Sequence, residues 1–215
     1  PWWQIAHEDF DAGKWSNKPA PGEVVDRYHQ QVSDFTIYQS LDGKWQLVSA
    51  VRSTNFPGNA HFLFRWESDS LEEPLWEERG KLWTTDDSPE SAGYTEGVLY
   101  APHCVRHEGA FYMFHNSADT AQVLVSDDGI HFEQGRSNSG EYVLFDTGEA
   151  GRDLMVLDDR QSSGKWICYY TSVDRSRPEL DPRQHHDLYA RVADHPLGPW
   201  SEPITVGMGA PRRPE

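Results

Sequence analysis

Three segments of this chain resemble one another at a period of about sixty residues, and this repeat constrains the fold more than any other feature. Each segment has a short apolar stretch, a turn with a glycine and then an aromatic-rich stretch, which is the pattern of a β-hairpin. The turn glycines are Gly43, Gly109 and Gly164, which are 66 and 55 residues apart. No stretch longer than about ten residues keeps a 3.6-residue apolar period, so the chain is predicted to contain almost no helix.

Each repeat supplies four predicted strands. The second strand of each hairpin begins near Trp45, Phe111 or Trp166, and an alternating strand and a last short strand follow it. The alternating strands are predicted at 61–66, 122–126 and 186–193, and the last strands are predicted to carry Trp76, Phe132 and Trp200. Four short antiparallel strands per repeat are typical of a β-propeller blade. A β-sandwich is the alternative all-β fold, but the motifs that recur at the strand starts favour the propeller.

The repeats predict a propeller that is larger than this chain. Propellers normally have about four to eight blades, and three blades cannot close a ring. We therefore assign residues 31–215 to three blades and the start of a fourth, and residues 1–30 to an N-terminal extension or closure segment. The last residues, "GMGAPRRPE", fall where the first strand of a fourth blade is expected.

Charge and cysteine content exclude several classes of function. The chain has 19 Lys and Arg against 35 Asp and Glu, a net charge of -16, which disfavours nucleic acid and anionic lipid as partners. No run approaches the roughly eighteen apolar residues of a membrane span. Cys104 and Cys168 lie far apart and form no CxxC pair, so we expect buried thiols rather than a zinc site or a disulfide framework.

Several motifs resemble those of the five-bladed β-propeller glycoside hydrolases, a group that includes families 43, 32, 62 and 117. "GKWICYYTS" is similar to their second strand, and "DDGIHFEQ" and "DHPLGPWSEP" are similar to the endings of their outer strands. The resemblance spans roughly residues 30–215. It implies a five-bladed propeller that hydrolyses a glycosidic bond in an oligosaccharide or polysaccharide, without an organic cofactor. It also implies a secreted or periplasmic protein.

The resemblance places three candidate catalytic carboxylates at the starts of the innermost strands. A glycosidase needs two carboxyl groups that flank the scissile bond. Asp34 opens the first repeat, Asp153 opens the third, and Glu215 falls where a fourth should open. By resemblance, Asp34 is the general base or the nucleophile, and Glu215 is the general acid. Asp153 then orients this acid or stabilises the transition state.

Three further residues are candidates for substrate binding. Arg152 precedes Asp153 in a pair that resembles the "RDP" motif of the fructan-active families. His103 lies in "LYAPHCVRH", which resembles the second-blade strand of these enzymes and implies a place at the channel wall. There it would bind a sugar hydroxyl or hold a hydrated structural calcium ion through water, although no set of metal ligands is recognisable nearby. Trp83 lies outside the repeated tryptophan positions and is a candidate for stacking on a sugar ring.

Two other functions remain open at this stage. The first is a propeller that binds carbohydrate without catalysis, since a fold does not by itself carry a function. The second is a glycoside phosphorylase, which would need Arg152, Arg212 and Arg213 to converge on a phosphate. The sugar, the linkage, the stereochemical outcome and the oligomeric state are all left open by the sequence.

Overall fold

The computed structural model describes residues 31–52, 61–89, 98–173 and 186–207. These residues form thirteen strands in three antiparallel sheets, together with one 3₁₀ turn, η2 (Thr85–Asp87). A turn of this length is far too short to cross a membrane as a helix, and no longer helix occurs in the described ranges. The predicted all-β fold, with one sheet for each repeat, is therefore confirmed.

Each sheet follows the chain from its innermost to its outermost strand. The first sheet has the order β1 (Gln31–Gln39), β2 (Trp45–Arg52), β3 (Phe62–Ser68) and β4 (Glu77–Trp83). The second has β5 (Tyr100–His107), β6 (Ala110–Ser117), β7 (Thr120–Ser126) and β8 (Glu133–Gln134), and a fifth strand, β9 (Phe145–Asp146), also pairs with β7. The third has β10 (Arg152–Asp159), β11 (Lys165–Val173), β12 (His186–Ala193) and β13 (Ile204–Gly207). The extra strand β9 was not expected from the four-strand repeat.

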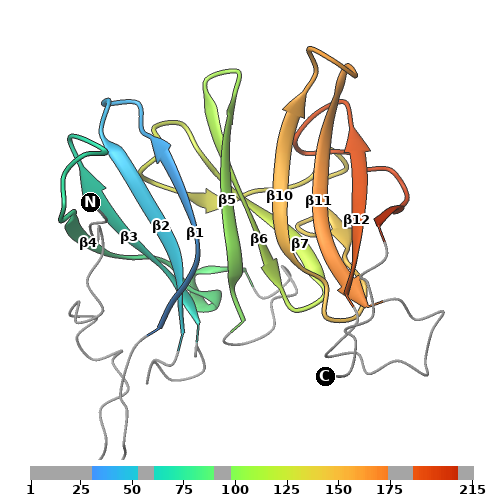
Figure 1. Ribbon diagram of the computed structural model, residues 1–215, viewed down its shortest axis with the longest axis horizontal. Coiled ribbons are helices and arrows are strands. Elements are labelled where there is room, and N and C mark those ends of the chain that lie inside the picture. The colour runs from blue at the N-terminus through green and yellow to red at the C-terminus, as the bar shows by residue number, and fades with distance from the viewer. Residues whose placement is uncertain (1–30, 53–60, 90–97, 174–185, 208–215) are drawn as a thin grey trace, which may run out of the picture.

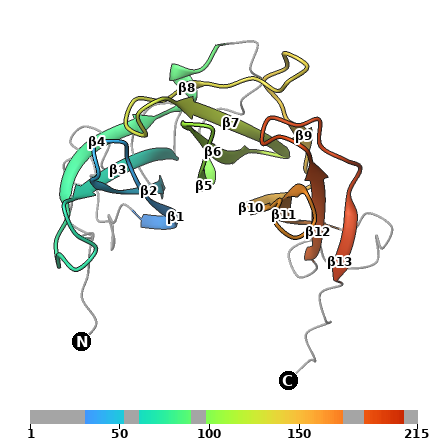
Figure 2. The same ribbon diagram turned by 90° about the horizontal axis from the view of Figure 1, so that it is seen from above.

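The three sheets stand like blades around a common axis. Figure 1 shows β1, β5 and β10 side by side along the inner face of the molecule, and β5 contacts both of the others. Seen from above, in Figure 2, the sheets form an open arc with β4, β8 and β13 at its outer edge. This radial arrangement brings the beginnings of three strands that are distant in sequence to one end of the axis.

The hairpin turns are placed as the sequence predicts. Gly43, Gly109 and Gly164 have φ of 87°, 88° and 75°, in the left-handed region that side chains other than glycine rarely adopt. A Cβ atom at any of the three would meet no atom within 4 Å. The backbone conformation, rather than lack of space, therefore requires glycine at these turns.

The aromatic residues assigned to the last strand of each repeat lie before that strand instead. β4 begins directly after Trp76, β8 directly after Phe132, and β13 four residues after Trp200. The outer strands are largely exposed, whereas Trp76 and Phe132 are only 6% and 8% exposed. The prediction that these aromatic residues lie on the last strands was wrong, because a large apolar ring is more stable buried beneath the sheet than on a strand that faces water.

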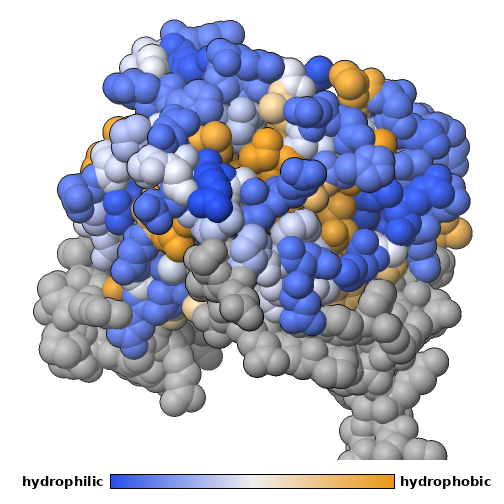
Figure 3. Space-filling view, turned by 180° about the vertical axis from the view of Figure 1, so that it is seen from behind, coloured by the Kyte–Doolittle hydropathy of each residue, from blue (hydrophilic) through white to orange (hydrophobic). Residues whose placement is uncertain are grey.

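Hydrophobic clusters join neighbouring sheets. Between the first two sheets, Val48 and Leu63 pack in one cluster with Phe111 and Met113. Between the second and third, a second cluster is built around Trp166, which is completely buried. These two apolar clusters fix the radial arrangement of the three sheets. The outer face of the molecule, by contrast, is mostly hydrophilic with smaller hydrophobic patches (Figure 3).

Both cysteines are free thiols, as the sequence predicts. Cys168 is fully buried in the second cluster, while Cys104 on β5 is only partly buried. Burial raises the pKa of both thiols far above its ordinary value, so each stays protonated.

Candidate active site

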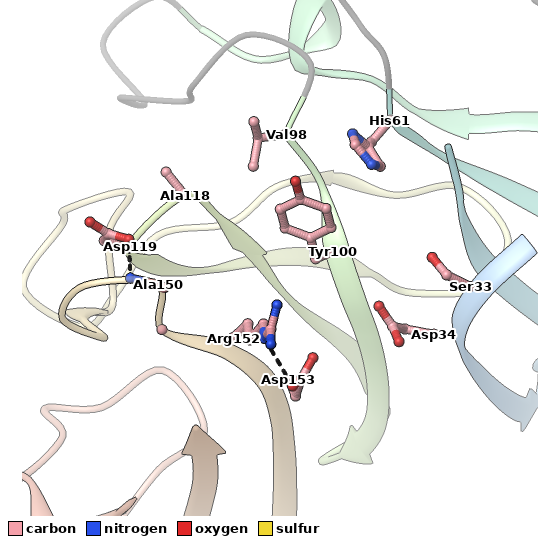
Figure 4. Close-up of a pocket in the computed structure, with 11 residues that line it drawn as sticks. Ser33, Asp34, His61, Val98, Tyr100, Ala118, Asp119, Ala150, Arg152 and Asp153 are labelled. Atoms are coloured by element: carbon pink, nitrogen blue, oxygen red, sulfur yellow. Dashed lines mark hydrogen bonds and ion pairs between the residues drawn. The ribbon is translucent and has the colours of Figure 1, made fainter. Parts of the chain in front are cut away.

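A cavity of about 830 Å³ opens where the three innermost strands begin. Its lining comes from all three sheets and from the loops between them (Figure 4). The lining residues are Ser33, Asp34, His61, Val98, Tyr100, Ala118, Asp119, Ala150, Gly151, Arg152 and Asp153. Two of the predicted carboxylates, Asp34 and Asp153, and the predicted binding residue Arg152 therefore share one cavity.

Each innermost strand has a β-bulge at this end. The register of the first sheet shifts between Ser33 and Phe35, so that Asp34 is the extra residue. In the second and third sheets the shifts fall between Tyr100 and His103 and between Arg152 and Met155. Ala101 and Asp153, inside these two intervals, have φ of 48° and 63°. Asp34, Ala101 and Asp153 therefore occupy corresponding places at the strand starts, and bulges of this kind re-aim side chains.

The carboxylate of Asp153 is held by its neighbours and reaches solvent. Oδ2 accepts a hydrogen bond from Oγ1 of Thr171 at 3.3 Å, and Nε of Arg152 lies 3.5 Å from the same oxygen. Its side chain is 49% exposed. A carboxyl group with an adjacent guanidinium at a strand start is well placed to meet a ligand in the cavity (Figure 4).

The hydroxyl groups of two serines fix the backbone that presents Asp34. Oγ of Ser49, a buried residue on β2, donates a hydrogen bond to the carbonyl oxygen of Ser33 and lies 3.2 Å from that of Asp34. Oγ of Ser33 donates to the carbonyl oxygen of Ala50 at 3.1 Å. The side chain of Asp34 itself is exposed to the cavity.

Tyr100 and His61 give the cavity an aromatic surface that the sequence analysis missed. Their ring centroids are 4.8 Å apart, in an edge-to-face arrangement. In Figure 4, the ring of Tyr100 is drawn above the side chains of Asp34, Arg152 and Asp153. Aromatic faces suit the apolar C–H surface of a sugar ring. The position of Tyr100, directly before "APH" at a strand start, was the one signal for it.

The other predicted site residues lie elsewhere. Nε2 of His103 is 3.0 Å from the carbonyl oxygen of Val156 on β10, and His103 is absent from the cavity lining. Burial lowers the pKa of its imidazole below the ordinary value. Trp83 is 8% exposed in the cluster between the first two sheets, and its Nε1 donates to Ser88 at 3.2 Å. Glu215 lies outside the described residues.

One group of potential metal ligands occurs among the described residues, and it is not at the cavity. His107, Glu108 and His195 place their ligand atoms within 4.8 Å of one another at the opposite end of β5. The backbone N–H of Leu197 already donates to Nδ1 of His195 at 3.1 Å. Nδ1 of His195 is therefore already occupied as a hydrogen-bond acceptor. The predicted calcium ion in the channel stays a prediction.

Comparisons with known proteins agree on the fold. No protein-family model and no curated protein sequence matches the chain. A thermostable family-43 glycoside hydrolase is 17% identical, with 83% of this chain and 54% of that one covered and a TM-score of 0.60. A family 117 glycoside hydrolase from the marine bacterium Zobellia galactanivorans is 15% identical, with 92% and 58% covered and a TM-score of 0.59. An endo-1,5-alpha-L-arabinanase from Thermotoga petrophila is 14% identical, with 81% and 40% covered and a TM-score of 0.57.

The resemblance predicted from the sequence motifs is thus confirmed at the level of the fold. The fold of this chain is similar to that of these three glycoside hydrolases, at identities of 17% or less. The chain spans 54%, 58% and 40% of their lengths.

Proposed function

We propose that this chain forms part of a glycoside hydrolase and that the cavity at the strand starts is its active site. The observation that carries the proposal is the convergence of Asp34 and Asp153 on one cavity from corresponding bulges of β1 and β10. Glycosidic hydrolysis requires two carboxyl groups that flank the scissile bond. Asp34 is proposed as one of them and Glu215, which lies outside the described residues, as the other, with Asp153 in support. The structural relatives, which are glycoside hydrolases, support the same reading.

The proposed roles follow the resemblance. Asp34 attacks the anomeric carbon or activates a water molecule, Asp153 orients the acid or stabilises the positive charge of the transition state, and Glu215 protonates the leaving oxygen. The ring of Tyr100 packs against the sugar, and the guanidinium of Arg152 donates hydrogen bonds to its hydroxyl groups. Carbohydrate is accordingly the proposed partner, and export from the cytoplasm would bring the enzyme to it.

Further blades are part of the proposal. One face of the third sheet packs on the second sheet, while the other lies toward the open side of the arc (Figure 2). That open face carries large apolar side chains that are 38% to 50% exposed, namely Met155, Leu157, Leu188 and Ile204. A neighbouring blade would remove them from water, and two more blades would give the five that the resemblance implies.

Turnover by the full-length protein tests the proposal. We expect Asp34→Asn and Asp153→Asn to lower kcat on the true substrate by about 10²- to 10⁴-fold, because each removes a carboxylate that acts on the transition state. The assay is a screen of aryl glycosides and plant or algal oligosaccharides, followed by NMR of the first-formed anomer. Asp158→Asn is the matched control, since Asp158 is on the same strand but outside the cavity and paired with Arg160.

Two outcomes would contradict the proposed function. Near-native turnover in Asp34→Asn and Asp153→Asn would reject the site. Saturable binding of an oligosaccharide without turnover by the wild type, weakened in both variants, would identify a carbohydrate-binding propeller instead.

A further inference from the structure

The connection between the second and third sheets carries the chain from the outer strand β9 to the innermost strand β10. It comprises residues 147–151 and delivers Arg152 and Asp153 directly into the cavity. The turn is closed by a hydrogen bond from the N–H of Gly151 to the carbonyl oxygen of Gly148, at 3.0 Å. Any change in this turn is therefore transmitted to the candidate catalytic carboxylate two residues later.

One residue of this connection and one residue just after it have strained backbone conformations. Ala150 and Asp153 have φ of 53° and 63°, although neither is glycine. Conformations of this kind are energetically unfavourable and persist only where the surroundings hold them. The structure must therefore supply contacts that hold Ala150 in place.

Asp119 supplies those contacts from the second sheet. It lies in the tight turn between β6 and β7, and Oδ1 of its carboxylate accepts a hydrogen bond from the N–H of Ala150 at 2.9 Å (Figure 4). The backbone carbonyl oxygen of the same residue accepts from the N–H of Thr147 at 2.7 Å. Asp119 thus forms hydrogen bonds to the connection at two residues, Thr147 and Ala150.

A further hydrogen bond from the same hairpin also holds the connection. Nδ2 of Asn116, a buried residue at the end of β6, donates to the carbonyl oxygen of Gly151 at 3.3 Å. The end of the β6–β7 hairpin therefore binds both sides of Ala150. The carboxylate of Asp119 also lines the cavity, so its charge alone would suggest a role in catalysis.

We infer that Asp119 is a positioning residue, whose hydrogen bond to Ala150 holds the β9–β10 connection so that Asp153 enters the cavity. The effect of Asp119 on turnover rests on the function proposed above, whereas its hydrogen bond to Ala150 does not depend on that function. The carboxylate acts as a hydrogen-bond acceptor, and its charge is not required. This distinction separates the inference from a third catalytic carboxylate, which a neutral amide could not replace.

The test compares Asp119→Ala with Asp119→Asn in the full-length protein. Asparagine retains an acceptor oxygen and alanine does not, so amide hydrogen exchange at Ala150 should rise about 10- to 100-fold in Asp119→Ala and stay within about threefold of wild type in Asp119→Asn. We expect kcat to fall at least about tenfold in Asp119→Ala, with KM nearly unchanged, and Asp119→Asn to restore it. Asp42→Ala, in the β1–β2 turn outside the cavity, controls for the loss of one charge.

Three results would overturn the inference. The first is unchanged exchange at Ala150 in Asp119→Ala. The second is loss of kcat in Asp119→Asn as complete as in Asp119→Ala, with normal exchange at Ala150, which would make the carboxylate a catalytic group. The third is an equal effect of Asp42→Ala. If the wild type hydrolyses no glycoside, the proposed function fails, while hydrogen exchange still decides whether Asp119 holds the connection.

Discussion

Asp34 and Asp153 point into the cavity because of backbone geometry at single residues. Each occupies a bulge, and the corresponding place in the second sheet is taken by Ala101. That alanine is 6% exposed and brings no charge, while Tyr100 beside it lines the cavity. A β-bulge at the start of the innermost strand thus directs an aspartate into the cavity in the first and third sheets, and lies beside Tyr100 in the second.

Gly151 makes the closest approach in the connection that leads to Asp153. A Cβ atom at this position would lie 2.6 Å from the carbonyl oxygen of Thr147 and would also overlap the side chain of Thr147. We expect Gly151→Ala to lower the free energy of unfolding by about 1–3 kcal/mol, because the backbone has to shift. Urea unfolding curves measure this loss.

Gly207 on β13 provides the control for Gly151. A Cβ atom there would meet nothing within 4 Å, so Gly207→Ala should change stability by less than about 0.5 kcal/mol. If the two substitutions changed the free energy of unfolding equally, the close contacts at Gly151 would not be destabilising and the prediction would be wrong.

His115 on β6 makes the stability of the protein depend on pH. Burial lowers the pKa of its imidazole from 6.5 to about 4, against a smaller opposing effect of a backbone hydrogen bond at Asn116. The unfolded chain therefore binds the proton more readily than the folded one between these two values. Stability is fully present above pH 6.5 and should fall by about 3 kcal/mol as the pH drops to about 4.

Urea unfolding of wild type and His115→Gln at about pH 7 and about pH 5 measures this contribution. The wild type should lose more stability between the two conditions, because the variant has no imidazole to protonate. His103, His186 and His195 also have lowered pKa values, mainly through burial, and contribute in the same direction in both proteins. Equal losses in wild type and variant would contradict the prediction.

At the scale of elements, Glu67 joins three strands of the first sheet. It lies on β3 and its carboxylate is 2.9 Å from Arg79 on β4 and 3.0 Å from Lys44 next to β2. Burial alone would raise its pKa, but hydrogen bonds from Gln46, Lys44 and Arg79 outweigh burial and hold the pKa at about 2. Its stabilising effect is therefore present above pH 4.5 and is lost as the pH falls toward 2.

Replacing Glu67 should loosen the attachment of the outer strand. We expect Glu67→Gln to lower the free energy of unfolding by about 1–3 kcal/mol, since Arg65 loses its charged partner and Arg79 loses the mostly buried one of its two. Glu77→Gln is the control, because Glu77 pairs with the same Arg79 but its side chain is 67% exposed. A change of more than about 0.5 kcal/mol in the control would count against the importance of burial.

At the scale of the whole molecule, the open face of the third sheet should behave as an uncovered interface. Met155 and Leu157 are paired with Tyr169 and Ile167 across the strands, so their side chains share that face. We expect this 215-residue chain to bind the apolar dye ANS, and Leu157→Gln with Leu188→Gln to reduce the fluorescence at least about twofold.

A second double variant serves as the control for the dye experiment. Leu41 and Leu75 are 60% and 56% exposed but lie in loops of the first sheet. Leu41→Gln with Leu75→Gln should leave the ANS signal nearly unchanged. An equal reduction in both double variants would mean that the open face binds no more dye than scattered leucines do.

Much of the fold could be predicted because its signals are local. The turns at Gly43, Gly109 and Gly164 and the strands around them depend on residues that are close in sequence. The misplaced outer strands show the limit of this reasoning. Trp76 resembles a strand residue in its sequence context, yet the core beneath the sheet determines where its ring lies.

The candidate site was predicted only in part. The motif around Asp153 led to Arg152 and to the carboxylate itself, and both line the cavity. His103 and Trp83 do not line it, since one bonds to β10 and the other packs in the core. Nothing near Asp119 in the sequence marks it, because its partner Ala150 is 31 residues away.

The sequence by itself determined the all-β repeat, because hairpin turns and apolar periodicity are properties of short stretches. Its resemblance to the propeller glycoside hydrolases pointed to the acidic residues at the strand starts. Only the tertiary structure decided which of these residues meet. Packing between sheets brings the first residues of β1, β5 and β10 to one end of the axis, and the bulges then aim their side chains. Contacts of this kind depend on how distant segments fill space together, which local patterns do not encode.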